Sequence, residues 1–204
     1  MSKYFERQLE ELHVQLITLG SYCEKAISFS AKAIQKVQNE EIARQVFETD
    51  RDIDAKEREI ENLCLSLLLH QHPVARDLRE ISAALKMVSD MERIGDQACD
   101  ITGIAKKDAE VLTIRENTHL DKMAKATISM VSKSIQSFIK QNLIIAHEVI
   151  EQDDTVDELF NRVKKETISL IHEDPGKGEE CVAIVMIAKY FERIGDHASN
   201  IAEW

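Results

Sequence analysis

The pentapeptide Glu-Arg-Ile-Gly-Asp occurs twice in this chain, at Glu92–Asp96 and at Glu192–Asp196. The segment before each copy repeats as well, with a shift of 103 rather than 100 residues. The difference falls in a turn, where a change of length costs little. The matched upstream pairs are Val46 with Val149, Asp50 with Asp153, Ile53 with Val156 and Ile60 with Val163. A repeat of this length indicates that one folding unit is duplicated.

Apolar residues recur at alternating steps of three and four along most of the chain, which is the heptad pattern of packed helices. The clearest stripe runs from Phe5 to Val37. Glycine (6) and proline (2) are scarce and charged residues reach 31%, a composition typical of long helices with few turns. We therefore predict an all-α protein. The predicted helices or their stripes cover residues 5–37, 46–67, 73–107, 118–141, 149–170 and 181–202.

These helices predict two tandem three-helix bundles that arise from the internal duplication. The first comprises residues 1–107, the second residues 117–204, and a connector of weaker periodicity covers residues 108–116. Pro73 is placed in the first turn of the third helix, a position that favours proline.

Acidic residues occupy stripe positions where apolar side chains are expected. In each half two acids lie in a stripe, and a second acid follows each of them one turn later on the same face. Burying unpaired carboxylates is costly, so something must compensate for these charges. The pairs are Asp50/Asp54 and Glu92/Asp96 in the first half, and Asp153/Asp157 and Glu192/Asp196 in the second.

The turns predict that the acids of each half lie level with one another. If the second and third helices are antiparallel about Pro73, Asp50 lies beside Asp96 and Asp54 lies beside Glu92. Each hairpin therefore gathers four carboxylates. The corresponding pairs about the turn at Asp174 and Pro175 are Asp153 with Asp196 and Asp157 with Glu192.

Three explanations of these clusters stay open. A buried salt-bridge network needs facing basic residues, but the five clearest stripes carry none, and Arg93 and Arg193 point off their stripes. The acids alternatively form a solvated face. A bound cation, which we favour, would neutralise the carboxylates directly, and all-oxygen ligands suit Mg, Ca, Mn or oxidised iron. Asp100 and Asn200 are candidate additional ligands.

Gly95 and Gly195 lie at equivalent positions beside the acids. Glycine inside a helix costs about 1 kcal/mol relative to alanine. Its presence in both halves indicates that bulk is excluded there, either by a site or by close helix packing.

Several functional classes are disfavoured. A net charge of −11 without a run of Lys or Arg argues against nucleic acid as a partner.

The longest uncharged stretch, residues 62–75, is shorter than the ~20 apolar residues that span a bilayer, and charges near the N-terminus argue against a signal peptide. We predict a cytoplasmic location. None of the eight clustered acids belongs to a Glu-x-x-His motif, since Gly95 and Gly195 stand where the histidine would be, and no nucleophile elbow or phosphate-binding loop is found, so no catalytic residue is predicted. The cysteines Cys23, Cys64, Cys99 and Cys181 are expected to be small stripe residues without disulfides.

Met91–Asp96 and Phe191–Glu203 resemble the paired signatures of the PhoU family, and Pro73–Arg79 is similar to that family too. The resemblance covers essentially the whole chain. It implies a fold of two tandem three-helix bundles. It also implies multinuclear iron or zinc clusters held by E(D)xxxD motifs, which fall on the eight acids named above, on a face open to solvent or to a partner.

The resemblance further implies a function. The protein would be a negative regulator of phosphate uptake and phosphate-regulon signalling, an adaptor between the ATPase subunit of a phosphate ABC transporter and a sensor histidine kinase, and commonly a homodimer. The segment Asp174–Gly178 departs from the Arg-Asp-Leu-Arg stretch of the first half, so the halves need not bind the same partner. The alternatives are a carboxylate-bridged metalloenzyme and a plain helical scaffold with incidental acids.

Overall fold

The computed structural model describes residues 3–35, 40–70, 73–107 and 118–204. Within these ranges the chain forms six α-helices and one short 3-10 turn, without strands, so the predicted all-α fold is confirmed. The predicted connector, residues 108–116, lies outside the described residues. The elements are α1 (Lys3–Gln35), α2 (Glu40–His70), α3 (Ala75–Lys107), α5 (Thr118–Lys140), α6 (Leu143–Glu173), η1 (Pro175–Lys177) and α7 (Gly178–Glu203).

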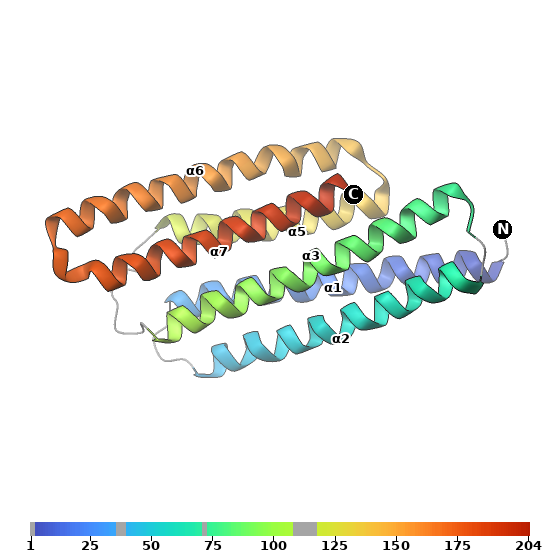
Figure 1. Ribbon diagram of the computed structural model, residues 1–204, viewed down its shortest axis with the longest axis horizontal. Helices are drawn as coiled ribbons and strands as arrows, with labels where there is room; N and C mark the ends of the chain where they lie inside the picture. The colour runs from blue at the N-terminus through green and yellow to red at the C-terminus, as the bar shows by residue number, and fades with distance from the viewer. Residues whose placement is uncertain (1–2, 36–39, 71–72, 108–117) are drawn as a thin grey trace.

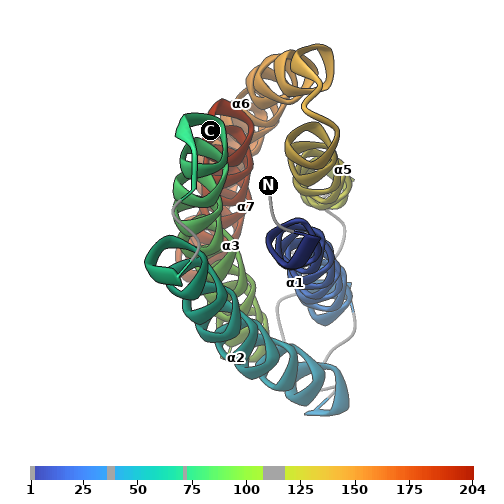
Figure 2. The same cartoon turned by 90° about the vertical axis from the view of Figure 1, so that its right-hand side faces the viewer.

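The helices form two three-helix bundles, α1–α3 and α5–α7, which lie side by side (Figure 1). The hairpins α2–α3 and α6–α7 are antiparallel, and α3 packs against α7 in the middle of the molecule, again antiparallel. Seen from the end, α2, α3, α7 and α6 make a curved layer, and α1 and α5 lie on its concave side (Figure 2). The outermost helices of this layer are therefore α2 and α6.

The core follows the predicted stripe most closely in α1, where Leu12, Leu16 and Leu19 are fully buried. In α3 and α7 a wider surface is buried, because each of these helices packs against the other bundle as well as its own. Sequence reasoning treated the two halves as independent and did not predict this contact. The extra buried residues include Met87, Met91, Ile94, Ile187, Phe191 and Ile194.

The start of α3 differs from its prediction. The helix begins at Ala75 rather than Pro73, and the first helical hydrogen bond runs from the Leu78 N–H to the Val74 carbonyl (2.9 Å). The stripe predicted for residues 73–107 has Val74 and Leu78 as its first members, but these two side chains are 64% and 48% exposed. The prediction failed because the buried face of these turns consists of Asp77, Ile81 and Ala84, which are spaced about one turn apart.

All four cysteines are free thiols. Cys23, Cys64 and Cys181 are buried as expected, whereas Cys99 is only half-buried, beside the first group of acids. None of the helices, over the residues described, has the length and apolar character needed to cross a membrane.

Candidate metal sites between the hairpin helices

The first acidic cluster consists of Asp50 and Asp54 on α2 and Glu92 and Asp96 on α3. The structure brings the four together, since Asp54 and Asp96 both raise the pKa of Asp50, and all three raise the pKa of Glu92 after the larger effect of its burial. Asp96 is exposed and the other three are half-buried. The cluster is therefore partly open to solvent along the α2–α3 hairpin, which agrees better with the open face that the resemblance implies than with a fully buried position.

Asp50 is the innermost acid of this cluster. Its Oδ1 is buried and has no hydrogen-bond partner among the described residues. Burial is the main cause of its raised pKa; the Cys99 thiol, which donates a hydrogen bond to the carboxylate, acts in the opposite direction. A β-carbon added to Gly95 would lie 2.7 Å from this oxygen. Glycine thus lets the carboxylate pack directly against the backbone of α3, and a side chain there would force Asp50 to shift.

The second cluster repeats this arrangement with Asp153 and Asp157 on α6 and Glu192 and Asp196 on α7. The Oδ1 atom of Asp153 is also buried without a partner, and a β-carbon on Gly195 would lie 2.9 Å from it. Burial first, and then the charges of Asp196, Asp157 and Glu192, raise the pKa of Asp153 to about 6. In both hairpins the inner acid, Asp50 or Asp153, therefore lies close to the acids of the facing helix.

The donor chemistry of both clusters suits a hard or borderline cation. Each has an inward carboxylate oxygen that lacks a partner and three further carboxylates around it, and a cation would remove the electrostatic cost that raises these pKa values. In the part of the chain that is described, no three Asp, Glu, His or Cys side chains already converge as a metal site. Ion binding would therefore require the outer carboxylates to turn inward.

The candidate additional ligands have other contacts. Asn200 donates a hydrogen bond to Asp90 Oδ1 on α3 (3.2 Å), so it faces away from the second cluster and is not placed as a ligand. Asp100 accepts a hydrogen bond from the Tyr190 hydroxyl, which lowers the pKa of Asp100 against the larger effects of burial and Asp96. The sequence pattern places Asp100 and Asn200 one turn beyond the acids, but it could not show that both side chains form hydrogen bonds with the neighbouring bundle.

Asp90 is a residue that sequence reasoning missed. Its carboxylate accepts hydrogen bonds from His197 Nδ1 (2.9 Å) and Trp204 Nε1 (3.4 Å), in addition to Asn200. Burial alone would raise the pKa of Asp90, but these hydrogen bonds outweigh it and the pKa is lowered. Asp90 therefore joins α3 of one bundle to the end of α7 of the other.

Comparison with known proteins agrees with this duplicated architecture. Two stretches of the chain, residues 16–105 and 120–204, each match the family model described as the PhoU domain. The chain belongs to the PhoU family. Both acidic clusters lie within the matched stretches, one in each PhoU domain.

Individual PhoU relatives cover nearly the whole chain. A protein of Clostridium acetobutylicum named "Phosphate-specific transport system accessory protein PhoU homolog" is 36% identical over 98% of this chain and 92% of its own length. One of the same name from Aquifex aeolicus is 37% identical over 92% of this chain and 84% of its own. The crystal structure of PhoU from Pseudomonas aeruginosa superposes with a TM-score of 0.88 at 30% identity, covering 98% of this chain and 95% of that one.

The two PhoU domains differ around their acids. In the second domain Lys189 Nζ lies 2.5 Å from both carboxylate oxygens of Glu192 and 5.5 Å from the centre of the Phe160 ring. The repeat places Ser89 and Glu57 at these two positions in the first domain. Sequence reasoning overlooked Lys189 because it lies off the stripe, although a spacing of three residues brings it to Glu192. The first domain instead has Arg58, whose Nη2 lies 3.8 Å from Asp54 Oδ2, where the repeat places Asn161.

Proposed function

We propose that this chain is a cytoplasmic negative regulator of phosphate uptake and phosphate-regulon signalling. It acts as a metal-binding adaptor between the ATPase of a phosphate ABC transporter and a sensor histidine kinase. The observation that carries the proposal is the match of both halves to the PhoU domain, with relatives named as accessory proteins of phosphate-specific transport systems. In this proposal the acids act as ligands and not as catalysts.

The metal ligands proposed are the four acids of each cluster, with iron or zinc as the bound ion and Mg, Mn or Ca as alternatives. Support comes from the unpartnered Oδ1 atoms of Asp50 and Asp153 and from the glycines that make room for them. A bound cation would neutralise each cluster. Asp50 and Asp96 would then link α2 to α3, and Asp153 and Asp196 would link α6 to α7, stiffening the hairpins.

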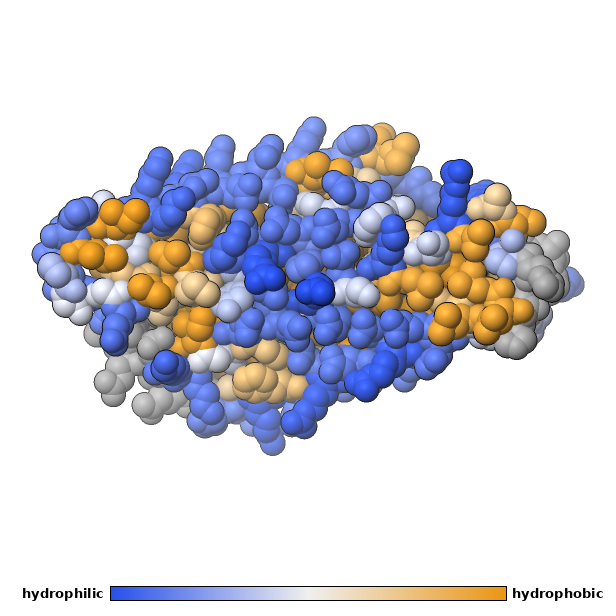
Figure 3. Space-filling view, in the orientation of Figure 1, coloured by the Kyte–Doolittle hydropathy of each residue, from blue (hydrophilic) through white to orange (hydrophobic). Residues whose placement is uncertain are grey.

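Exposed apolar side chains support a role in binding other proteins. They gather at the ends of the two hairpins, on opposite sides of a largely hydrophilic face (Figure 3). Apolar surface of this kind is typical of protein–protein contacts. Two separate ends would let one molecule contact two partners, or one partner and a second copy in a homodimer. The residues are Leu65, Leu69, Val74 and Leu78 at one end and Ile168, Ile171, Val182 and Met186 at the other.

The regulatory role is tested by deleting the gene in its own bacterium and measuring phosphate-starvation gene expression in phosphate-rich medium. We expect expression without starvation, restored repression when the wild-type gene is returned, and recovery of the transporter ATPase or the kinase with the tagged protein. Normal repression in the deletion strain would contradict the proposal.

The metal site is tested by plasma mass spectrometry of untagged protein. Wild type is compared with the double variant Glu192→Ala/Asp196→Ala and with the control Glu151→Ala/Glu158→Ala, which removes two exposed acids of α6 outside the cluster. We expect near-stoichiometric or higher metal in wild type and control and a clear reduction in the cluster variant. Metal-free wild-type protein, folded and unaffected by the substitutions, would favour the plain scaffold.

A further inference from the structure

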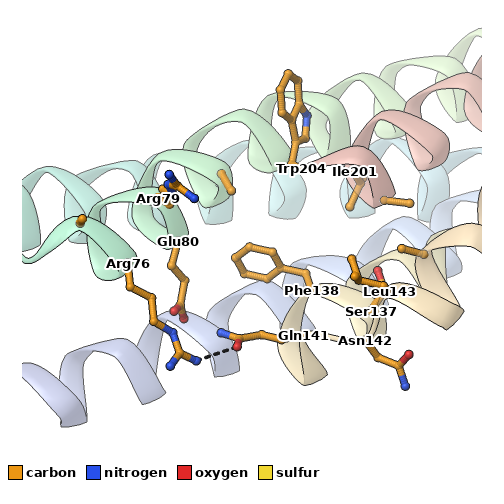
Figure 4. Close-up of a pocket in the computed structure, with 14 residues that line it drawn as sticks. Arg76, Arg79, Glu80, Ser137, Phe138, Gln141, Asn142, Leu143, Ile201 and Trp204 are labelled. Carbon is orange, nitrogen blue, oxygen red and sulfur yellow. Dashed lines mark hydrogen bonds between the residues drawn. The ribbon is translucent and has the colours of Figure 1, made fainter.

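A cavity of about 570 Å³ lies away from both acidic clusters, where the start of α3, the α5–α6 turn and the end of α7 meet (Figure 4). Cavities of roughly 300–1,000 Å³ are the size that small-molecule ligands occupy in proteins. The volume is much larger than a single inorganic ion needs. The ligand it suits is therefore an organic molecule.

One wall of the cavity carries two arginines from the first turns of α3. Arg76 and Arg79 are three residues apart and so share a helix face. Arg76 Nη2 donates a hydrogen bond to Gln141 Oε1 across the cavity (2.7 Å), and the close-up shows this bond between α3 and the end of α5 (Figure 4). Arg79 has no hydrogen-bond or ion-pair partner among the described residues. A free guanidinium beside an anchored one is suited to bind an anion with two or more oxygens.

Two long helices also direct their N-terminal ends at this cavity. Ala75, the first residue of α3, lines it, as do Asn142 and Leu143, the N-cap and first residue of α6. The N-terminus of a helix carries partial positive charge and favours anions. The end of α3 therefore adds to the field of the arginines, whereas the N–H groups of Ile144 and Ile145 at the start of α6 already donate to Asn142 Oδ1.

Among the described residues one acid, against two arginines, lines the cavity. Glu80 lines the cavity, but its Oε1 lies 2.6 Å from His13 Nε2 and its side chain is only 13% exposed. Asp77, in the first turn of α3, is buried and does not line the cavity. In a chain of net charge −11, the cavity is thus a local basic site.

The cavity also has an apolar part. Phe138 projects into it from α5 (Figure 4), Ala146 and Ile201 lie beside it on α6 and α7, and Ala83 continues the α3 wall beyond Arg79. A ligand that fills the space must therefore combine an anionic group with an apolar or ring-shaped part.

We propose that this cavity binds an organic phosphate of the nucleoside monophosphate class. The phosphoryl group lies between Arg76, Arg79 and the N-terminal end of α3, and the organic part packs against Phe138. The arginine pair occurs in the first repeat alone, because the repeat places Gly176 and Glu179 at the equivalent positions of the second half. A small molecule bound in this cavity would act on the protein independently of its metal clusters.

Trp204 is the only tryptophan of the chain and lines the cavity, so its fluorescence reports on the site. Purified full-length protein is titrated with AMP, ribose 5-phosphate, adenosine and inorganic phosphate at constant ionic strength, with calorimetry as a second readout. We expect AMP to bind more tightly than inorganic phosphate and adenosine not to bind measurably. Arg76→Gln and Arg79→Gln should each weaken AMP binding about tenfold or more.

The matched control is Arg162→Gln, an exposed arginine of α6 outside the cavity. It should leave AMP binding unchanged, and thermal unfolding should confirm that all variants are folded. The proposal is overturned if AMP does not bind at millimolar concentration, if inorganic phosphate binds as tightly as AMP, or if the control weakens binding as much as the cavity variants. None of these outcomes depends on metal or on regulation of transport.

Discussion

Oδ1 of Asp50 lies so close to the backbone of Gly95 that a β-carbon there would stand 2.7 Å from it. The same relation holds between Asp153 and Gly195, at 2.9 Å. Each acidic cluster is therefore built around one carboxylate pressed against the neighbouring helix, and the glycine in each copy of Glu-Arg-Ile-Gly-Asp makes that approach possible.

Gly95→Ala should lower the free energy of unfolding by about 1–3 kcal/mol, since the new methyl group would also stand 2.9 Å from Ile53 Cδ1. Urea unfolding followed by circular dichroism measures the change. The control is Gly103→Ala in the same helix, where nothing lies within 4 Å and alanine should be neutral or stabilising by up to about 1 kcal/mol. Equal stability of Gly95→Ala and wild type would mean that Asp50 moves aside without cost.

Asp153→Asn should stabilise the metal-free protein in a pH-dependent way. The folded-state pKa of Asp153, about 6, lies above its ordinary 3.8, so ionisation costs stability as the pH rises through this interval. The variant should therefore match wild type near pH 4 and exceed it by about 1–2 kcal/mol at pH 8, after allowance for solvent screening. Urea unfolding across this range is the measurement, and a constant difference would contradict the assigned cause.

Lys189→Ser should strengthen cation binding to the second cluster, because Lys189 already places a positive charge on Glu192. We expect a gain of about tenfold for Mn²⁺ in calorimetric titrations, made in a background of Asp50→Asn/Asp96→Asn that disables the first cluster. Lys165→Ser, an exposed lysine of α6, is the control and should have no effect. An unchanged affinity in Lys189→Ser would show that the lysine does not compete with the ion.

Asp90→Asn should weaken the contact between the two domains. The loss of a charged acceptor for His197 and Trp204 is expected to cost about 1–3 kcal/mol at pH 7 and to shift the fluorescence of Trp204 to longer wavelength. Because the pKa of Asp90 is lowered by folding, this contribution is present above the ordinary pKa of 3.8 and is lost as the pH falls through the lower folded value. Asp52→Asn, an exposed acid of α2, should change neither readout.

The sequence predicted the helices and the pairing of acids across each hairpin, because both depend on local periodicity and turn position. The end of α5 was predicted within one residue, at Gln141 instead of Lys140. Gln141 follows the helix in the left-handed region, with a φ of 49°, although glycine is the residue usually found in that conformation. Asp90 could not be predicted, because its partners lie more than 100 residues away in another bundle. The stripe also left the depth of the acids open, because a heptad pattern does not show how deeply a residue lies between two helices.

The contact between α3 and α7 has a consequence for how this chain arose. Asp90 of the first domain meets Asn200 of the second, and Asp100 of the first meets Tyr190 of the second. In the numbering of the first repeat, Tyr190 corresponds to position 90 and Asn200 to position 100. Both contacts therefore join position 90 of one repeat to position 100 of the other, once in each direction. That reciprocity is the mark of an isologous two-fold interface between identical subunits. The chain is thus organised as a single-repeat homodimer whose subunits have been fused, and fusion freed each half to diverge, as Lys189 and the arginines of α3 have done.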